Sequence, residues 1–241
     1  GIGTVFRDKK IKALVVKYVG AKGECNGPAD WEDLAEVGSK MQREIHDQDP
    51  VMNNMRSYGT TMLTNIMNEF DLLPVHNFRY GSHPEATGLY KDVFREYTTL
   101  GIPDGCWYGC TLACARCVER LQLRTGPYKG QWVHVDGPEY ETVAGIGANC
   151  GIFDAHAVLE GNFYCDMYGI DTISFGTATA FAMECYEAGI LNKERTGGLD
   201  LRFGNAEAML ELLHQMARGE GFGTVVGQGV RRMKRIFIEK Y

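Results

Sequence analysis

The stretch GCWYGCTLACARC, residues 105–117, contains four of the eight cysteines in the chain. Three, three and two residues separate these cysteines from one another. Thiolates at such short spacings suit a metal ion or an iron–sulfur cluster, because soft sulfur ligands select zinc, copper(I) and iron–sulfur centres. A Pro-Asp-Gly turn signal precedes the stretch at Pro103, and Val118 and Leu121 follow it with helical spacing. The pattern therefore predicts that the thiolates lie on a loop and on the first turns of a helix.

Two other interpretations of these cysteines stay open at this point. Disulfides are typical of secreted chains, but Cys110 and Cys114 would lie one helical turn apart, which disfavours a bond between them. A structural zinc site is the stronger rival, because Cys114 and Cys117 form a CxxC half-site. The usual second half-site, another CxxC or an HxxxH, does not occur in the sequence. The spacing alone therefore only slightly favours an iron–sulfur cluster.

The composition is that of an ordinary soluble globular protein, with 44% hydrophobic and 23% charged residues in a chain of 241. The net charge of -6 argues against a nucleic-acid partner, which would require a basic face. No apolar run approaches the roughly 20 residues of a membrane span. The many cysteines predict a reducing, cytoplasmic location. The first residues already resemble the middle of a fold, so we expect the chain to be a segment of a longer polypeptide.

The hydrophobic periodicity predicts a mainly helical protein. A strand is expected at residues 11–19, which are rich in β-branched side chains, and a short strand at 131–135. Asp30 and Asn205 are candidate N-caps, Pro50 is expected to end a helix, and Pro138 suits the first position of another. Helices are predicted at 31–47, 60–70, 88–97, 138–148, 155–168, 172–188, 205–219 and 224–241.

Small residues at 144–148 (AGIGA) predict a close approach of a second element to this part of the chain. Glycine and alanine leave room for a neighbouring backbone or for a flat ligand. The approaching group is either another helix or a bulky cofactor, and the sequence alone does not choose between them.

Several segments together resemble the aldehyde ferredoxin oxidoreductase family, the tungsten-bis-pterin enzymes. They occur in the order of the family and span nearly the whole chain. Besides the cysteine stretch they are GIGTVFRDKKIKAL (1–14), GPEYET (137–142), GANCGI (147–152), DMYGIDT (166–172), DLRFGNA (200–206) and GEGFG (219–223).

The resemblance implies a β-rich pterin-binding domain followed by two helical domains. Residues 1–28 are then expected to be the C-terminal β segment of the first domain. Residues 29–241 are expected to form the helical second domain, with the iron–sulfur ligands and a pterin-binding motif. The third domain is expected to lie outside the chain.

The same resemblance implies ligands for a [4Fe–4S] cluster. The family motif is Cys-x-x-Cys-x-x-x-Cys, and Cys110 and Cys114 match its last two positions. Cys106 matches the first position with one extra residue in between, and Cys117 is then a spare thiol. The fourth ligand is expected in the absent third domain.

The pterin motif of the family, Asp-x-x-Gly-Leu-Asp, resembles DMYGID, and its residues Asp166, Gly169, Ile170 and Asp171 are the expected pterin-binding positions. Carboxylates suit the N–H donors of a pterin edge. Ordinary helix capping is the alternative role for both aspartates. Thr4 resembles a residue of the segment that helps to hold magnesium between the pterin phosphates.

Three further residues carry roles implied by the resemblance. Glu141 aligns with an acid near the metal, so it is expected to transfer protons, although a glutamate that stabilises a helix N-terminus is the plain alternative. His83 is a candidate acid for protonating an aromatic ring, or else a surface histidine. Cys150 is a possible tungsten ligand, or else a buried structural thiol.

The implied activity is that of a tungstopterin and [4Fe–4S] oxidoreductase. Three features favour the catalytic subunit of class II benzoyl-CoA reductase, which reduces an aryl-CoA ring: the CWYGC sequence, the insertion at 126–130 and residues 189–194. The alternative is an aldehyde:ferredoxin oxidoreductase, and a further alternative is a non-catalytic iron–sulfur electron-transfer subunit. Ferredoxin or an iron–sulfur subunit is the expected electron partner, and an oligomer is expected.

Overall fold

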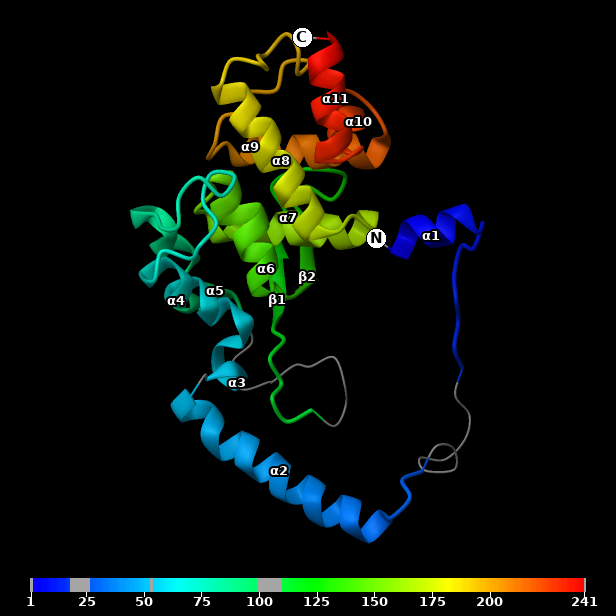
Figure 1. The fold of residues 1–241 in the computed structure, drawn as a ribbon, viewed down its shortest axis with the longest axis vertical. Coiled ribbons are helices and arrows are strands. Elements are labelled where there is room, and N and C mark those ends of the chain that lie inside the picture. Colours follow the sequence, from blue (N-terminus) through cyan, green and yellow to red (C-terminus); the bar gives the residue numbers. More distant parts are fainter. Residues whose placement is uncertain (1, 18–26, 53, 99–109, 241) are drawn as a thin grey trace. The chain divides into compact units, whose positions relative to one another are not determined.

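A computed structural model describes residues 2–17, 27–52, 54–98 and 110–240 (Figure 1). The chain divides into two compact units, residues 1–53 and 54–241, which we treat separately. The predicted domain boundary at residue 28 stays a prediction.

The first unit contains the helices α1 (Ile2–Asp8) and α2 (Trp31–Met52). The strand predicted at residues 11–19 is wrong for residues 11–17, which have no regular secondary structure; residues 18 and 19 lie outside the described part. A strand needs a partner for its backbone groups, and the described residues offer none to this segment. Asp30 caps α2 as predicted, because its Oδ1 accepts the amide hydrogens of Glu32 at 2.9 Å and Asp33 at 3.0 Å. Pro50 lies inside the last turn of α2 instead of ending it.

The second unit is mainly helical, as predicted. Its helices before the sheet are α3 (Met55–Tyr58), η1 (Gly59–Met62), α4 (Leu63–Glu69), η2 (Pro84–Leu89) and α5 (Lys91–Tyr97). After the sheet follow α6 (Tyr140–Thr142), η3 (Val143–Gly147), η4 (Ala148–Cys150), α7 (Ala155–Tyr168), α8 (Thr172–Glu187), α9 (Ala206–Arg218), α10 (Gly223–Val226) and α11 (Val230–Lys240).

The cysteine stretch continues into a strand, so the helix predicted after it is wrong. Strand β1 (Cys117–Gln122) pairs antiparallel with β2 (Trp132–Asp136). The register shifts between Val118 and Leu121, where β1 carries an irregularity of the β-bulge type. A bulge changes the two-residue alternation, so both side chains are buried although they are three residues apart. This spacing imitates the period of a helix.

Two other predicted helix boundaries also differ from the structure. The predicted helix 224–241 is broken after α10, where Gly229 adopts φ +83° before α11 begins. The helix expected to start at Pro138 begins at Tyr140 instead. Pro138 follows a cis peptide bond, and Glu139 has extended backbone (φ -87°, ψ 163°) as the N-cap.

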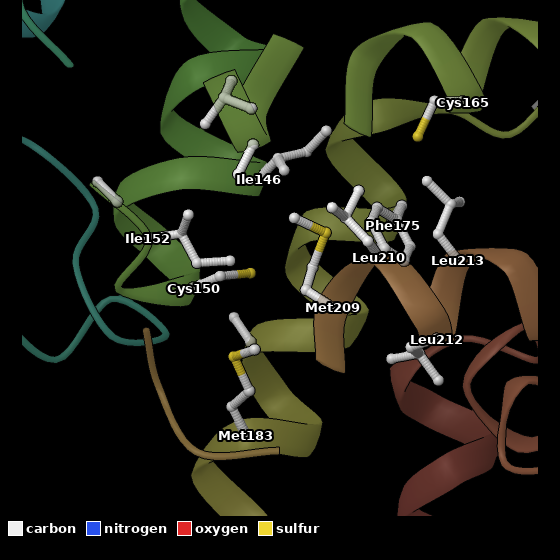
Figure 2. Packing of buried hydrophobic residues seen from close by; sticks show 14 of the residues in the cluster. Ile146, Cys150, Ile152, Cys165, Phe175, Met183, Met209, Leu210, Leu212 and Leu213 are labelled. Atoms are coloured by element: carbon white, nitrogen blue, oxygen red, sulfur yellow. The ribbon is translucent and has the colours of Figure 1, made fainter. Parts of the chain in front are cut away.

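Helix α7 lies at the centre of the second unit (Figure 1). Its residues from Ala155 to Gly161 are all buried, so it is covered on every side, as expected for an internal helix. Helices α8 and α9 pack against it, and Figure 2 shows side chains of η3, α8 and α9 meeting in the same cluster. Ile146, Phe175 and Met209 are at most 1% exposed there.

The small residues at 144–148 meet a helix, which selects one of the two predicted alternatives. A Cβ built on Gly176 of α8 would lie 2.4 Å from the carbonyl carbon and oxygen of Gly145. The two backbones are therefore in direct contact. Beside this crossing the hydroxyls of Thr142 and Thr172 lie 2.9 Å apart.

Among the described residues, no single helix is both long and apolar enough to cross a membrane; a bent pair, Tyr140–Cys150 with Ala155–Tyr168, passes by length and composition only.

A chain of polar side chains runs through the core from Tyr168 to Glu160. The Tyr168 hydroxyl lies 2.9 Å from Nδ1 of His214, whose Nε2 lies 3.0 Å from the Thr125 hydroxyl. Thr125 donates its hydroxyl hydrogen to Glu160 at 2.6 Å. The Glu160 carboxylate also accepts the amide hydrogens of Arg124 at 3.0 Å and Thr125 at 2.7 Å, and it is 0% exposed. It therefore accepts hydrogens from two backbone amides and one hydroxyl that lie outside its own helix.

The pKa values of three histidines predict how the free energy of unfolding depends on pH. Burial lowers the pKa of His76, His156 and His214, so in the fold these rings bind protons only at a lower pH than in the unfolded chain. In the unfolded chain they bind protons below about pH 6.5. Because the unfolded state then binds more protons, the free energy of unfolding should fall as the pH drops through this value. Urea unfolding at pH 7.5 and 5.5 would measure this, and His214→Gln should weaken the dependence. An unchanged dependence in this variant would contradict the prediction.

Candidate functional site

A cavity of about 430 Å³ lies where β2 ends and α7 gives way to α8. Its walls come from four places in the sequence: the start of β1, the turn between β2 and α6, the end of α7, and the start of α8. The lining residues are Ala115, Asp136, Gly137, Glu139, Thr142, Asn162, Asp166, Ile170, Asp171 and Thr172. Three of the four expected pterin-binding residues of the DMYGID motif are among them.

The end of α7 explains how this motif reaches the cavity. Gly169 adopts the left-handed conformation (φ +66°) that ends the helix. The amide of Ile170 donates to the carbonyl of Cys165 at 2.8 Å, a reversal typical of helices that end in glycine. The chain turns back there, which places Asp166, Ile170 and Asp171 on one wall. Gly169 itself is exposed and is not part of the lining.

The two aspartates of the motif differ in their surroundings. Asp171 is the N-cap of α8, where its Oδ2 accepts the amide hydrogen of Ser174 at 2.8 Å; hydrogen bonds from the side chain and then from the amide of Ser174 lower the pKa of Asp171. Asp171 thus does perform the capping that was the alternative role. The side chain of Asp166 caps no helix, and none of the hydrogen bonds within the described ranges involves its carboxylate.

The Asp166 carboxylate is open to the cavity and yet partly desolvated by the protein. Desolvation, and then the negative charge of Asp136, raise its pKa. A partly desolvated carboxylate is stabilised by any ligand that donates N–H or O–H hydrogen bonds, because these bonds replace those of the missing water.

The charge of the lining restricts which ligands fit. Four of its residues are acids: Asp136, Glu139, Asp166 and Asp171. Among the described residues, the lining contains no lysine, arginine or histidine. An anionic ligand group would therefore be repelled, whereas a flat ring with several N–H donors would find acceptors on two walls.

The structure separates the two neighbouring glutamates of the GPEYET segment. Glu139 is half-buried and lines the cavity, whereas Glu141 is exposed and does not. The expected acid was Glu141, and Glu139 was not predicted. The contact that holds Glu139 in the wall comes from a distant part of the chain, so no local signal identified it. The role of Glu141 in proton transfer stays a prediction.

His83 lies in a different place, against the aromatic residues of a loop. Its ring stacks on Phe153 with centroids 4.6 Å apart, and the centroid of His76 lies 5.8 Å away. Nδ1 of His83 accepts the amide hydrogen of Glu85 at 3.2 Å, so the proton of the neutral ring lies on Nε2. The ring can therefore donate a hydrogen bond. His83 does not line the 430 Å³ cavity, and its role as an acid stays a prediction.

The predicted cluster ligands are only partly within the described residues. Cys106 lies outside them. Cys110 is exposed, and Cys114 and Cys117 are half-buried. Sγ of Cys117 lies 2.9 Å from Nε2 of His134 on the neighbouring strand. Within residues 2–17, 27–52, 54–98 and 110–240, no group of three or more histidine, cysteine or acidic side chains is arranged to hold a metal ion. The cluster therefore stays a prediction.

Cys150 is not among the residues that line the cavity, and Thr4 belongs to the first unit. Cys150 is 0% exposed, and Figure 2 shows it beside Ile152 with its sulfur directed into the core. Its thiol lies 3.5 Å from each of the carbonyls of Gly145 and Gly176, and burial strongly raises its pKa. This position is that of a structural thiol, the alternative role, and tungsten ligation stays a prediction. Thr4 is exposed on α1 in the first unit, and its role near magnesium likewise stays a prediction.

One protein-family model matches most of the chain. The family model for aldehyde ferredoxin oxidoreductase, domains 2 and 3, matches residues 36–241. The chain therefore belongs to the aldehyde ferredoxin oxidoreductase family.

Two similar proteins are much longer than this chain. The chain is 34% identical to the tungsten-containing aldehyde ferredoxin oxidoreductase of Pyrococcus horikoshii over 98% of its length, and 35% identical to that of Pyrococcus furiosus over 97%. It spans 37% and 36% of the length of these two relatives.

One solved structure resembles the fold. It is the active site complex BamBC of benzoyl coenzyme A reductase, in complex with 1,5-dienoyl-CoA. The TM-score is 0.69 with 20% sequence identity, and the match covers 98% of this chain and 35% of that one. At this level of identity the similarity concerns the fold alone.

Proposed function

We propose that this chain is part of a tungsten-pterin oxidoreductase and that the 430 Å³ cavity holds a pterin ring of its cofactor. The observation that carries the proposal is Asp166: a partly desolvated carboxylate that lines the cavity without a hydrogen-bond partner among the described residues. It stands at the first position of the DMYGID motif, which resembles the pterin motif of the family.

The residues of the cavity fit such a group. A pterin edge carries several N–H donors, and the acidic lining supplies acceptors without a competing cation. Asp166 and Asp171 would accept from the ring edge, while Ile170 supplies apolar contact and Gly169 allows the chain to turn. When bound, tungsten between two dithiolenes supplies two-electron redox chemistry, and the protein supplies position and exclusion of water.

The cysteine stretch would supply the route for single electrons. We propose that Cys106, Cys110 and Cys114 bind a [4Fe–4S] cluster that exchanges electrons with ferredoxin or an iron–sulfur subunit. The spacing of these cysteines and the membership of the family support this part of the proposal. The fourth ligand, a magnesium ion near Thr4 and the assembly into an oligomer belong to the same proposal for the whole enzyme.

For the substrate we propose an aldehyde, oxidised to its carboxylic acid. The sequence identity of 34% and 35% to two tungsten-containing aldehyde ferredoxin oxidoreductases supports this choice. The sequence analysis favoured reduction of an aryl-CoA thioester, and this stays the second candidate. The CWYGC sequence, the insertion at 126–130 and the fold shared with the benzoyl coenzyme A reductase complex support it.

Two measurements on the full-length enzyme, purified without oxygen from cells supplied with tungstate, test the proposal. Metal and pterin analysis should find tungsten, iron and pterin; zinc as the only metal would end it. Assays with an aldehyde and an oxidised low-potential electron acceptor, and separately with benzoyl-CoA and a strong reductant, then decide the substrate. Turnover of benzoyl-CoA without turnover of any aldehyde would select the second candidate.

Replacement of Asp166 tests the pterin site directly. Asp166→Asn removes the negative charge from the acceptor while it keeps the shape of the side chain. A hydrogen bond to a charged group contributes about 1.5–3 kcal/mol, so the variant should retain roughly 10-fold to 100-fold less pterin. Asp154→Asn is the matched control, because Asp154 caps the other end of α7 away from the cavity. Normal pterin content in Asp166→Asn would contradict the assignment.

A further inference from the structure

Glu139 is held in the cavity wall by a residue from a distant part of the chain. The hydroxyl of Thr60, in η1, donates its hydrogen to Oε2 of Glu139. The same hydroxyl accepts the amide hydrogen of Tyr140 at 2.8 Å. The Thr60 oxygen accepts the hydrogen of this amide through one lone pair, while the hydroxyl hydrogen is directed at the carboxylate. The Thr60 side chain thus fixes both the position and the direction of Glu139.

The turn that carries Glu139 is also fixed from its other side. Asn162 of α7 donates its amide hydrogen to the carbonyl of Asp136 at 2.6 Å. A Cβ on Gly137 would lie 3.6 Å from Nδ2 of the same asparagine, and the φ of this glycine is +94°. The turn between β2 and α6 is therefore tied to η1 and to α7, and Glu139 has little freedom to leave the wall.

One oxygen of Glu139 remains for a ligand. Oε2 is engaged by Thr60, whereas Oε1 has no hydrogen-bond partner in the described part of the chain. A carboxylate that is already oriented by the protein loses little conformational entropy when a ligand binds it. Its remaining oxygen is a strong acceptor for N–H groups.

We infer that Glu139 is a ligand-binding carboxylate of this cavity, which accepts an N–H hydrogen of a flat, donor-rich ring through Oε1 while Thr60 holds Oε2. The inference rests on the proposed function for the identity of that ring as pterin. It assigns this binding role to Glu139, and Glu141 on the exposed side of α6 takes no part in holding the ring.

Three variants of the full-length enzyme test this inference: Glu139→Gln, Thr60→Val and Glu141→Gln. They would be purified without oxygen from cells supplied with tungstate. The readouts are tungsten per protomer, pterin measured by the fluorescence of its oxidised form, and thermal unfolding. Glu119→Gln is the matched control, because Glu119 is exposed on β1 and outside the cavity lining.

We expect Glu139→Gln to retain about 10-fold less tungsten and pterin than the wild type, as fits the loss of one charge-assisted hydrogen bond. Thr60→Val should cause a smaller loss, about 3-fold, because the carboxylate stays but is no longer oriented. Glu141→Gln and Glu119→Gln should keep the wild-type cofactor content. If Glu139→Gln fails to fold, Thr60→Val still decides the question, since it leaves the charge of the cavity unchanged.

Each of the other outcomes would contradict either the inference or the proposed function. Normal tungsten and pterin in a folded Glu139→Gln or, where that variant does not fold, in Thr60→Val would overturn the inference. An equal loss in Glu141→Gln would overturn the distinction between the two glutamates and thus the inference. A wild-type enzyme with no pterin would overturn the proposed function, and the role of Glu139 with it.

Discussion

Glu160→Ala should lower the free energy of unfolding by about 3–5 kcal/mol. The carboxylate of Glu160 is fully buried in α7 and accepts the amide hydrogens of Arg124 and Thr125 together with the Thr125 hydroxyl. Alanine would leave these donors without partners, and each buried donor that loses its bond costs about 1–3 kcal/mol. The loss would also leave a cavity in the most buried helix of the unit.

Chemical unfolding of the purified protein, followed by circular dichroism, measures this effect. Glu207→Ala is the matched control, because Glu207 is exposed in the first turn of α9 and should change the free energy of unfolding by no more than about 0.5 kcal/mol. Glu160→Gln should fall between the two, since its amide oxygen can still accept one or two of the bonds. A loss below 1 kcal/mol in Glu160→Ala would show that water reaches these donors.

Gly176→Ala should destabilise the protein by about 3 kcal/mol. The added methyl group would lie 2.4 Å from the backbone of Gly145, and backbone cannot move aside as the end of a side chain can. Overpacking in a well-packed interior costs about 1–3 kcal/mol, and this contact belongs to the upper end of that range. Helix α8 would have to shift away from η3.

The same crossing provides its own control. A Cβ on Gly145 would meet its nearest neighbour, the carbonyl of Thr172, at 3.7 Å, which is an ordinary contact distance. Gly145→Ala should therefore change the melting temperature little, although it lies opposite Gly176. Equal destabilisation by both substitutions would mean that flexibility of the glycines, and not their small size, matters at this site.

The helices could be predicted from the sequence because their signals are local. The helical spacing of apolar residues and the N-cap candidate Asn205 predicted α9 correctly. Oδ1 of Asn205 accepts the amide hydrogen of Ala208 at 3.1 Å. The predicted end of the helix at residue 168 also agrees with α7. Strand β1 was missed because its bulge buries Val118 and Leu121 at a spacing that a helix would also produce.

The cavity was predicted only in part, for a similar reason. Asp166, Ile170 and Asp171 belong to one short segment, so a motif could identify them. Glu139 joins them because Thr60, almost eighty residues earlier in the chain, holds it in place. No local pattern contains that contact. The difference between Asp166 and Asp171 was visible only in part. Asp171 stands directly before the helix predicted at 172–188, which is the N-cap position, whereas the place of Asp166 in the cavity wall depends on the fold.

The contact between Gly145 and Gly176 has a consequence for ligand affinity. It joins the helical segment after β2 to α8, and the hydroxyls of Thr142 and Thr172 meet beside it at the edge of the cavity. Two walls of the cavity are thus joined by direct backbone contact, and we expect them to need little closure when a ligand enters. Binding there would spend little free energy on reorganisation, and the empty and filled shapes should be nearly the same.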